Sequence, residues 1–61
     1  MISRDDLQKI SDTANRIMRQ ANAALWTQPS QINEETLCTE IDKEANAILG
    51  ITETVRAKVK P

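Results

Sequence analysis

The residues of this 61-residue chain best suited to chemistry are the carboxylates of one short stretch, residues 33–53, which carries a net charge of −5. Glu40 and Glu44 stand four positions apart and share one side of a helix, where they could supply half of a site for a hard metal ion. Dinuclear carboxylate bundles also need a Glu-x-x-His motif, and the chain contains no His. We therefore expect a solvated helix face or an acidic surface aimed at a basic groove, and no metal or cofactor.

The composition also excludes the common nucleophilic and zinc sites. One Cys and no His leave no Cys/His zinc site, no Ser-His-Asp triad and no Cys–His pair. A single Gly leaves no material for a glycine-rich phosphate loop. Cys38 is expected to be a small buried hydrophobic residue. We assign no catalytic residue and expect that the chain is not an enzyme.

Trp26 is the one aromatic residue and a candidate contact for another protein, because Trp is enriched at binding hot spots. Arg16 and Arg19 lie on the same flank of the predicted helix and could frame such a site. The alternative is that Trp26 covers the following turn and packs on Pro29 and Ile32.

Asparagines recur beside the predicted core positions, although Asn is a poor helix former. Asn15, Asn22 and Asn46 are either solvated or form a polar ladder that sets the register of a partner helix. Together with the acidic pair, the candidate partner contacts are Trp26, Arg16, Arg19, Asn15, Asn22, Glu40 and Glu44.

The last residues are basic, in contrast to the acidic stretch before them. Arg56, Lys58 and Lys60 complement the negative end of a helix dipole, or else they contact phosphates. The second interpretation gives the alternative function, a small helical nucleic-acid-binding regulator that uses these residues with Arg16 and Arg19. The net charge of −1 makes nucleic acid the second choice of partner.

A first helix is predicted over residues 4–27, with Ser3 as its N-cap and Asp6 three residues later. Apolar residues follow at spacings of 3, 4, 3, 4 and 3, which is a heptad pattern. This predicted seam consists of Leu7, Ile10, Ala14, Ile17, Ala21 and Ala24, widened on one side by Met18 and Leu25.

Pro29 predicts a turn, after which Asn33 caps a second helix over residues 34–49. Gly50 is either an interior glycine or the residue that ends this helix, with Thr52 capping a short third helix over residues 52–60. We favour a break or kink at Gly50.

These elements predict an all-α fold: one domain, residues 1–61, forming an antiparallel helical hairpin. Small seam residues let helices approach closely, and a lone hairpin leaves one side of each seam uncovered. The architecture and length resemble the plasmid-encoded RNA-binding hairpins that dimerise into four-helix bundles, which implies that a homodimer can form. No apolar run approaches the roughly 20 residues of a membrane span, the first residues do not resemble a signal peptide, and a lone Cys fits the cytoplasm.

Residues Cys38-Thr39-Glu40-Ile41-Asp42 are similar to the Ser-Gln-Glu-Leu-Asp signature of the small aspartyl-phosphate phosphatases of sporulating bacteria, with Cys38 and Thr39 replacing Ser and Gln. This resemblance implies a third function, an aspartyl-phosphate phosphatase-like hairpin that docks on a response regulator. The leading hypothesis is a non-enzymatic protein-interaction module. It would be a regulator or inhibitor that occludes a surface of a larger bacterial or phage-related target.

Overall fold

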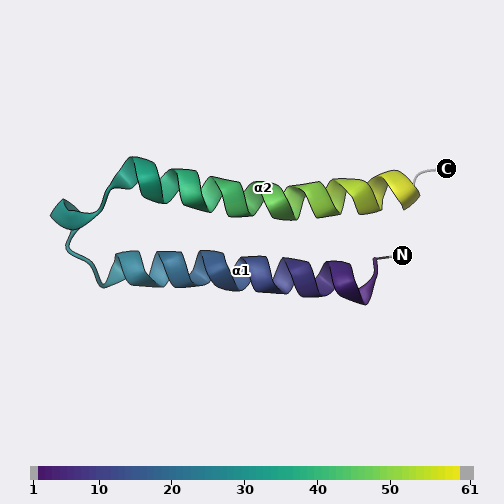
Figure 1. The fold of residues 1–61 in the computed structure, drawn as a ribbon, viewed down its shortest axis with the longest axis horizontal. Coiled ribbons are helices and arrows are strands. Elements are labelled where there is room, and N and C mark those ends of the chain that lie inside the picture. The colour runs from purple at the N-terminus through teal and green to yellow at the C-terminus, as the bar shows by residue number, and fades with distance from the viewer. Residues whose placement is uncertain (1, 60–61) are drawn as a thin grey trace.

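The chain is a two-helix antiparallel hairpin, seen in a computed structural model that describes residues 2–59. Helix α1 spans Arg4–Leu25, a short 3-10 helix η1 spans Pro29–Gln31, and helix α2 spans Glu34–Val59 (Figure 1). Residues 2–59 contain no strand, and the Cα trace extends 50 × 19 × 10 Å. The predicted all-α hairpin is confirmed.

Both helices begin at the predicted caps. The Ser3 hydroxyl accepts a 3.0 Å hydrogen bond from the Asp6 N–H, and the Asn33 side-chain oxygen accepts one of 3.1 Å from the Thr36 N–H. Each cap satisfies an N–H group that the first helical turn leaves without an intrahelical partner. At the other end α1 stops at Leu25, two residues before the predicted boundary, and Trp26 is its C-cap residue.

Helix α2 passes through Gly50 without interruption, so the predicted break and separate third helix are wrong for the described residues. Gly50 does not have the positive φ that a glycine takes when it terminates a helix. Thr52 does not cap a new helix, because its hydroxyl donates 3.1 Å to the Leu49 carbonyl within α2. One interior glycine costs only about 1 kcal/mol relative to Ala, too little to divide a 26-residue helix.

The helices face each other along a line shifted from the predicted seam. On α1 this line holds the buried Thr13 and four half-buried residues, Ile10, Ile17, Gln20 and Ala24. The other predicted seam residues are exposed: Leu7, Ala14 and Ala21. The opposing half-buried residues on α2 include Leu37, Ile41, Ile48 and Val55. Only half of the predicted apolar stripe is therefore covered by α2.

No hydrophobic residue among the described residues is fully buried. The one buried residue is Thr13, with 4% of its surface exposed, and its hydroxyl donates 2.7 Å to the Lys9 carbonyl. Two helices in a single layer have no third element to close over their contact line. The hairpin consequently presents broad surfaces without an enclosed core.

Candidate functional site

Trp26 protrudes from the turn end of the hairpin with 90% of its surface exposed. The alternative that it packs on Pro29 and Ile32 is therefore wrong. Because α1 ends at Leu25, Trp26 is a cap residue, and its N–H donates to the Ala23 carbonyl at 3.3 Å. The backbone is thus held by the helix end while the indole remains open to contact another molecule.

The exposed Trp continues a polar row on α1, which we call the outer stripe. Its members recur at spacings of 3 and 4 and are all exposed: Asp12, Asn15, Arg19, Asn22 and Trp26. This periodicity places them on one side of the helix. A shallow pocket of about 270 Å³ lies along the stripe, lined by Asp12, Asn15, Arg16 and Arg19. The structure therefore brings five of the predicted partner contacts to one region of α1: Asn15, Arg16, Arg19, Asn22 and Trp26.

Arg16 is also the link between the two helices. Its Nε donates 2.7 Å to the Glu44 Oε2, and its Nη2 donates 3.1 Å to the buried Thr13 hydroxyl. The Glu44 side chain is only 18% exposed as a result. Nothing in the sequence signals a pair 28 positions apart. This contact defines what we call the ion-pair side of the hairpin.

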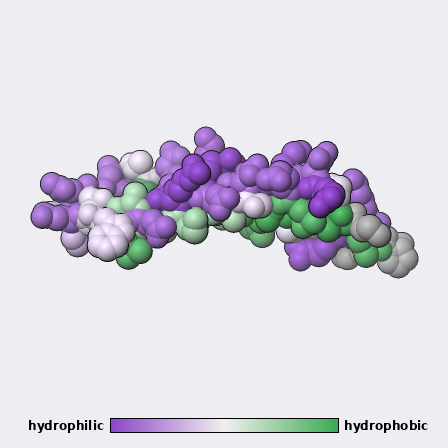
Figure 2. Space-filling model, turned by 90° about the horizontal axis from the view of Figure 1, so that it is seen from below, coloured by the Kyte–Doolittle hydropathy of each residue, from purple (hydrophilic) through white to green (hydrophobic). Residues whose placement is uncertain are grey.

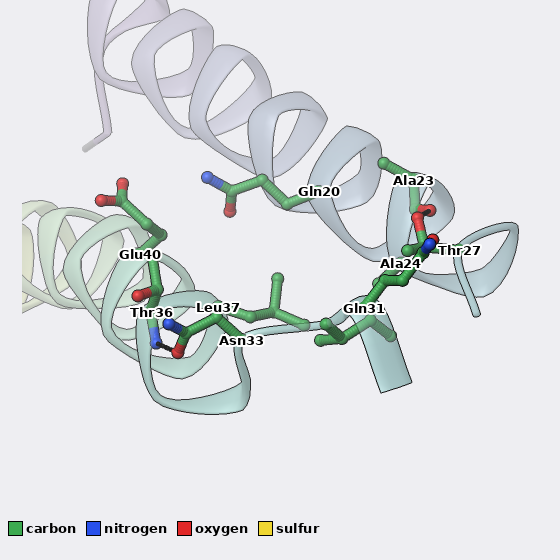
Figure 3. A pocket seen from close by; sticks show the side chains of 10 residues that line it. Gln20, Ala23, Ala24, Thr27, Gln31, Asn33, Thr36, Leu37 and Glu40 are labelled. Carbon is green, nitrogen blue, oxygen red and sulfur yellow. Dashed lines mark hydrogen bonds between the residues drawn. The ribbon is translucent and has the colours of Figure 1, made fainter. Parts of the chain in front are cut away.

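A groove of about 360 Å³ lies between the helices near the turn. Figure 3 shows Gln20 and Ala23 of α1 across from Leu37 and Glu40 of α2. Glu40 precedes Glu44 by one helical turn, and Ala23 follows Arg16 by two, so the groove opens on the ion-pair side. Glu40 is the only ionisable residue in its lining. The groove thus joins an apolar floor to a single carboxylate.

The other predicted residues are dispersed. Cys38 is exposed, so its predicted burial is wrong, because this position of α2 turns away from the contact line with α1. Asn46 is also exposed. Arg56 and Lys58 lie in the last turn of α2, whereas Lys60 lies outside the described residues. In the described part of the chain the basic residues at the end of α2 therefore do not form one surface with Arg16 and Arg19. The end of α2 lies beside the start of the antiparallel α1, whereas Arg16 and Arg19 lie in the second half of α1.

Large hydrophobic side chains remain open on α1. Met18 is 54% exposed and Leu25 is 76% exposed. Leu7 and Leu25 each lie nine residues from Arg16, about two and a half turns, and therefore on the opposite side of the helix. Met18 lies about 160° around the helix from Arg16. The large exposed apolar residues of α1, Leu7, Met18 and Leu25, thus point away from the ion-pair side.

The same relation holds on α2. The exposed Leu49 lies five residues after Glu44, about 140° around the helix. Because the Arg16–Glu44 pair joins the helices on one side, the exposed leucines of both helices lie on the other. Figure 2 shows most of the hydrophobic side chains along the lower edge of the molecule, with some hydrophilic ones between them, and mainly hydrophilic side chains along the upper edge. We call the side of the hairpin opposite the Arg16–Glu44 pair the apolar face, after its apolar residues Leu7, Ala14, Met18, Ala21, Leu25, Ala45 and Leu49.

Within residues 2–59 no group of three or more His, Cys, Asp or Glu side chains is arranged to hold a metal ion. No helix in that range combines the length and the hydrophobicity needed to cross a membrane.

Comparisons of the chain with models of known protein families, with curated proteins and with solved structures gave no match.

Proposed function

We propose that this chain is a non-enzymatic protein-interaction module, a regulator or inhibitor that covers a surface of a larger bacterial or bacteriophage protein. The observation that carries the proposal is Trp26, 90% exposed at the end of the outer stripe. An indole left in water by its own chain gains by entering an apolar pocket on a partner, and Trp is among the residues that dominate interface energies.

Other residues of the outer stripe fit this role. Arg19, Asn15 and Asn22 provide guanidinium and amide groups on the same stripe, which suits the polar rim around a buried anchor. Arg16 lines the shallow pocket along the outer stripe, and its Nε donates a hydrogen bond to Glu44. The mechanism is occlusion: Trp26 enters the target, the rim excludes water, and the 50 Å hairpin covers the surface beneath it.

We also propose, independently of the target, that two hairpins pair into a four-helix bundle in the cytoplasm. The outer stripe and the apolar face lie on different sides of α1, so one molecule can use both.

The test is capture of a target from a bacterial lysate on the immobilised 61-residue chain, with and without nuclease. We expect a protein that survives nuclease treatment, binds the native chain and is lost with Trp26→Ala. Gln28→Ala, another exposed residue at the same end, is the matched control and should retain it. Capture that disappears with nuclease would instead favour a nucleic-acid-binding regulator, and equal capture by Trp26→Ala would remove Trp26 as the anchor.

Trp26 also reports its own environment, since it is the only aromatic residue. Its fluorescence should shift to shorter wavelength when the purified target is added. An unchanged spectrum in a complex that demonstrably forms would contradict the anchoring role.

A further inference from the structure

We infer that a second copy of this chain covers the apolar face, so that two hairpins stack into a four-helix bundle. The inference deepens the proposed function and shares with it only the premise that the molecule acts through its surfaces. It assigns two surfaces different tasks: the apolar face binds the second copy, and the outer stripe is left for the target.

The hairpin has a larger exposed surface than a folded monomer of its mass is expected to have. The chain exposes 5190 Å², whereas a folded monomer of its mass is expected to expose about 4,000 Å². The excess of about 1,200 Å² is larger than the roughly 800 Å² that each partner contributes to a standard stable interface. The hairpin therefore has enough uncovered surface for one partner of its own size.

The part of the hairpin that the structure describes also lacks a fully buried apolar core. Among the described residues no hydrophobic side chain is fully buried, and domains of about this size are already marginal when they have a core. The half-buried isoleucines on the contact line, such as Ile10, Ile17 and Ile48, have only one neighbouring layer. A second hairpin on the apolar face would enclose them and complete the core that one copy lacks.

The sizes of the side chains on the α1 part of the apolar face also suit contact with a second copy. In a two-fold pair the same surface meets itself, so it must contain both projections and recesses. On α1, the large Met18 and Leu25 alternate with the small Ala14 and Ala21, and none of these four residues is charged. Large side chains of one copy can therefore fit over the alanines of the other. On α2, the charged Asp42 lies on the same side as Leu49, about 160° around the helix from Glu44.

The experiment compares two identical substitutions on one helix. Ala21 belongs to the apolar face, whereas Ala23 lies on the ion-pair side, and both are exposed alanines in α1. In Ala21→Arg a long charged side chain replaces a methyl group at the proposed interface of each copy. Ala23→Arg introduces the same charge and the same helix propensity outside that interface.

The masses of the native chain and both variants are measured by light scattering over a wide range of concentration. We expect the native chain and Ala23→Arg at twice 6.8 kDa, and a dimer dissociation constant at least about 100-fold higher for Ala21→Arg. A helical native monomer, a higher oligomer, or equal behaviour of the two variants would overturn the inference.

A second measurement remains decisive if Ala21→Arg fails to fold. The midpoint of thermal unfolding of the native chain should rise with protein concentration, because dissociation accompanies unfolding of a dimer. A midpoint that is independent of concentration would also overturn the inference. Neither measurement needs the target, so a native monomer that still captures a target through Trp26 would sink this inference and leave the proposed function intact.

Discussion

The two long sides of the hairpin differ in how completely the chain satisfies its own groups. On the ion-pair side, Arg16 contacts Glu44 and Thr13, and the Thr13 hydroxyl also donates to Lys9, so these polar groups find partners within one molecule. In the adjoining groove the buried Gln20 Oε1 has no hydrogen-bond partner among the described residues. On the apolar face, Met18 and Leu25 remain more than half exposed. Polar groups can be satisfied by one neighbour or by water, whereas apolar area is removed from water only by another surface.

The difference explains how a pair of amphipathic helices can form an ordered fold and still leave apolar surface uncovered. A helix in a hairpin has one neighbour, which covers one sector of its circumference. The apolar stripe of α1 is wider than that sector because Met18 and Leu25 extend it. The remainder of the stripe stays exposed because of this geometry, without any special residue.

The largest effect is expected for Ile17→Asp, which places a carboxylate between the helices beside the apolar face. An unpaired charge there should cost about 3 kcal/mol or more, a large part of the stability of a domain this small. Far-UV circular dichroism should show the loss of most helix. Asn15→Asp adds the same charge on the outer stripe and should change the free energy of unfolding by less than about 0.5 kcal/mol. Similar losses of helix in both variants would show that the contact line between the helices is no more sensitive to a buried charge than the outer stripe.

A smaller effect, about 2 kcal/mol per chain, is expected for Met18→Ala if a second copy covers the apolar face. Urea unfolding monitored by circular dichroism measures it. Arg19 follows Met18 in the chain but belongs to the outer stripe, so Arg19→Ala should change the free energy of unfolding by less than about 0.5 kcal/mol. If Met18→Ala lowered the free energy of unfolding as little as Arg19→Ala, the Met18 side chain would remain in water and no second copy would cover it.

Gly50→Ala should stabilise the chain by about 0.5–1 kcal/mol. Gly50 is exposed within α2, lacks a positive φ, and has no atom within 4 Å of the site where a Cβ would stand. Ala47→Gly, at another exposed position of α2, should lower the stability by a similar amount. Thermal unfolding of the two variants gives both values. Destabilisation by Gly50→Ala would indicate that the helix does end there.

The smallest effect is expected for the link on the ion-pair side. A double-mutant cycle with Arg16→Ala and Glu44→Ala should give a coupling of about 0.5 kcal/mol, since Arg16 is 55% exposed and water competes for the pair. The coupling should fall as salt is added. A coupling of several kcal/mol, unaffected by salt, would show that this side contributes as much as the apolar face.

Local features were predictable from the sequence because they depend on residues near one another. The Ser3 and Asn33 caps, the turn near Pro29 and the two helices follow from capping chemistry, backbone restriction and apolar periodicity. The error at Gly50 has the same origin. A glycine followed by a Thr fits both a helix end and a helix interior, and the local pattern does not distinguish them.

The sequence by itself determined that two amphipathic helices form and that an apolar stripe runs along the first. The tertiary structure alone decided which part of that stripe α2 covers, that Arg16 meets Glu44, and that Cys38 and Trp26 are exposed. The physical reason is that a heptad pattern specifies a side of a helix only to within a broad sector. The rotation of one helix against the other depends on contacts between residues far apart in the chain.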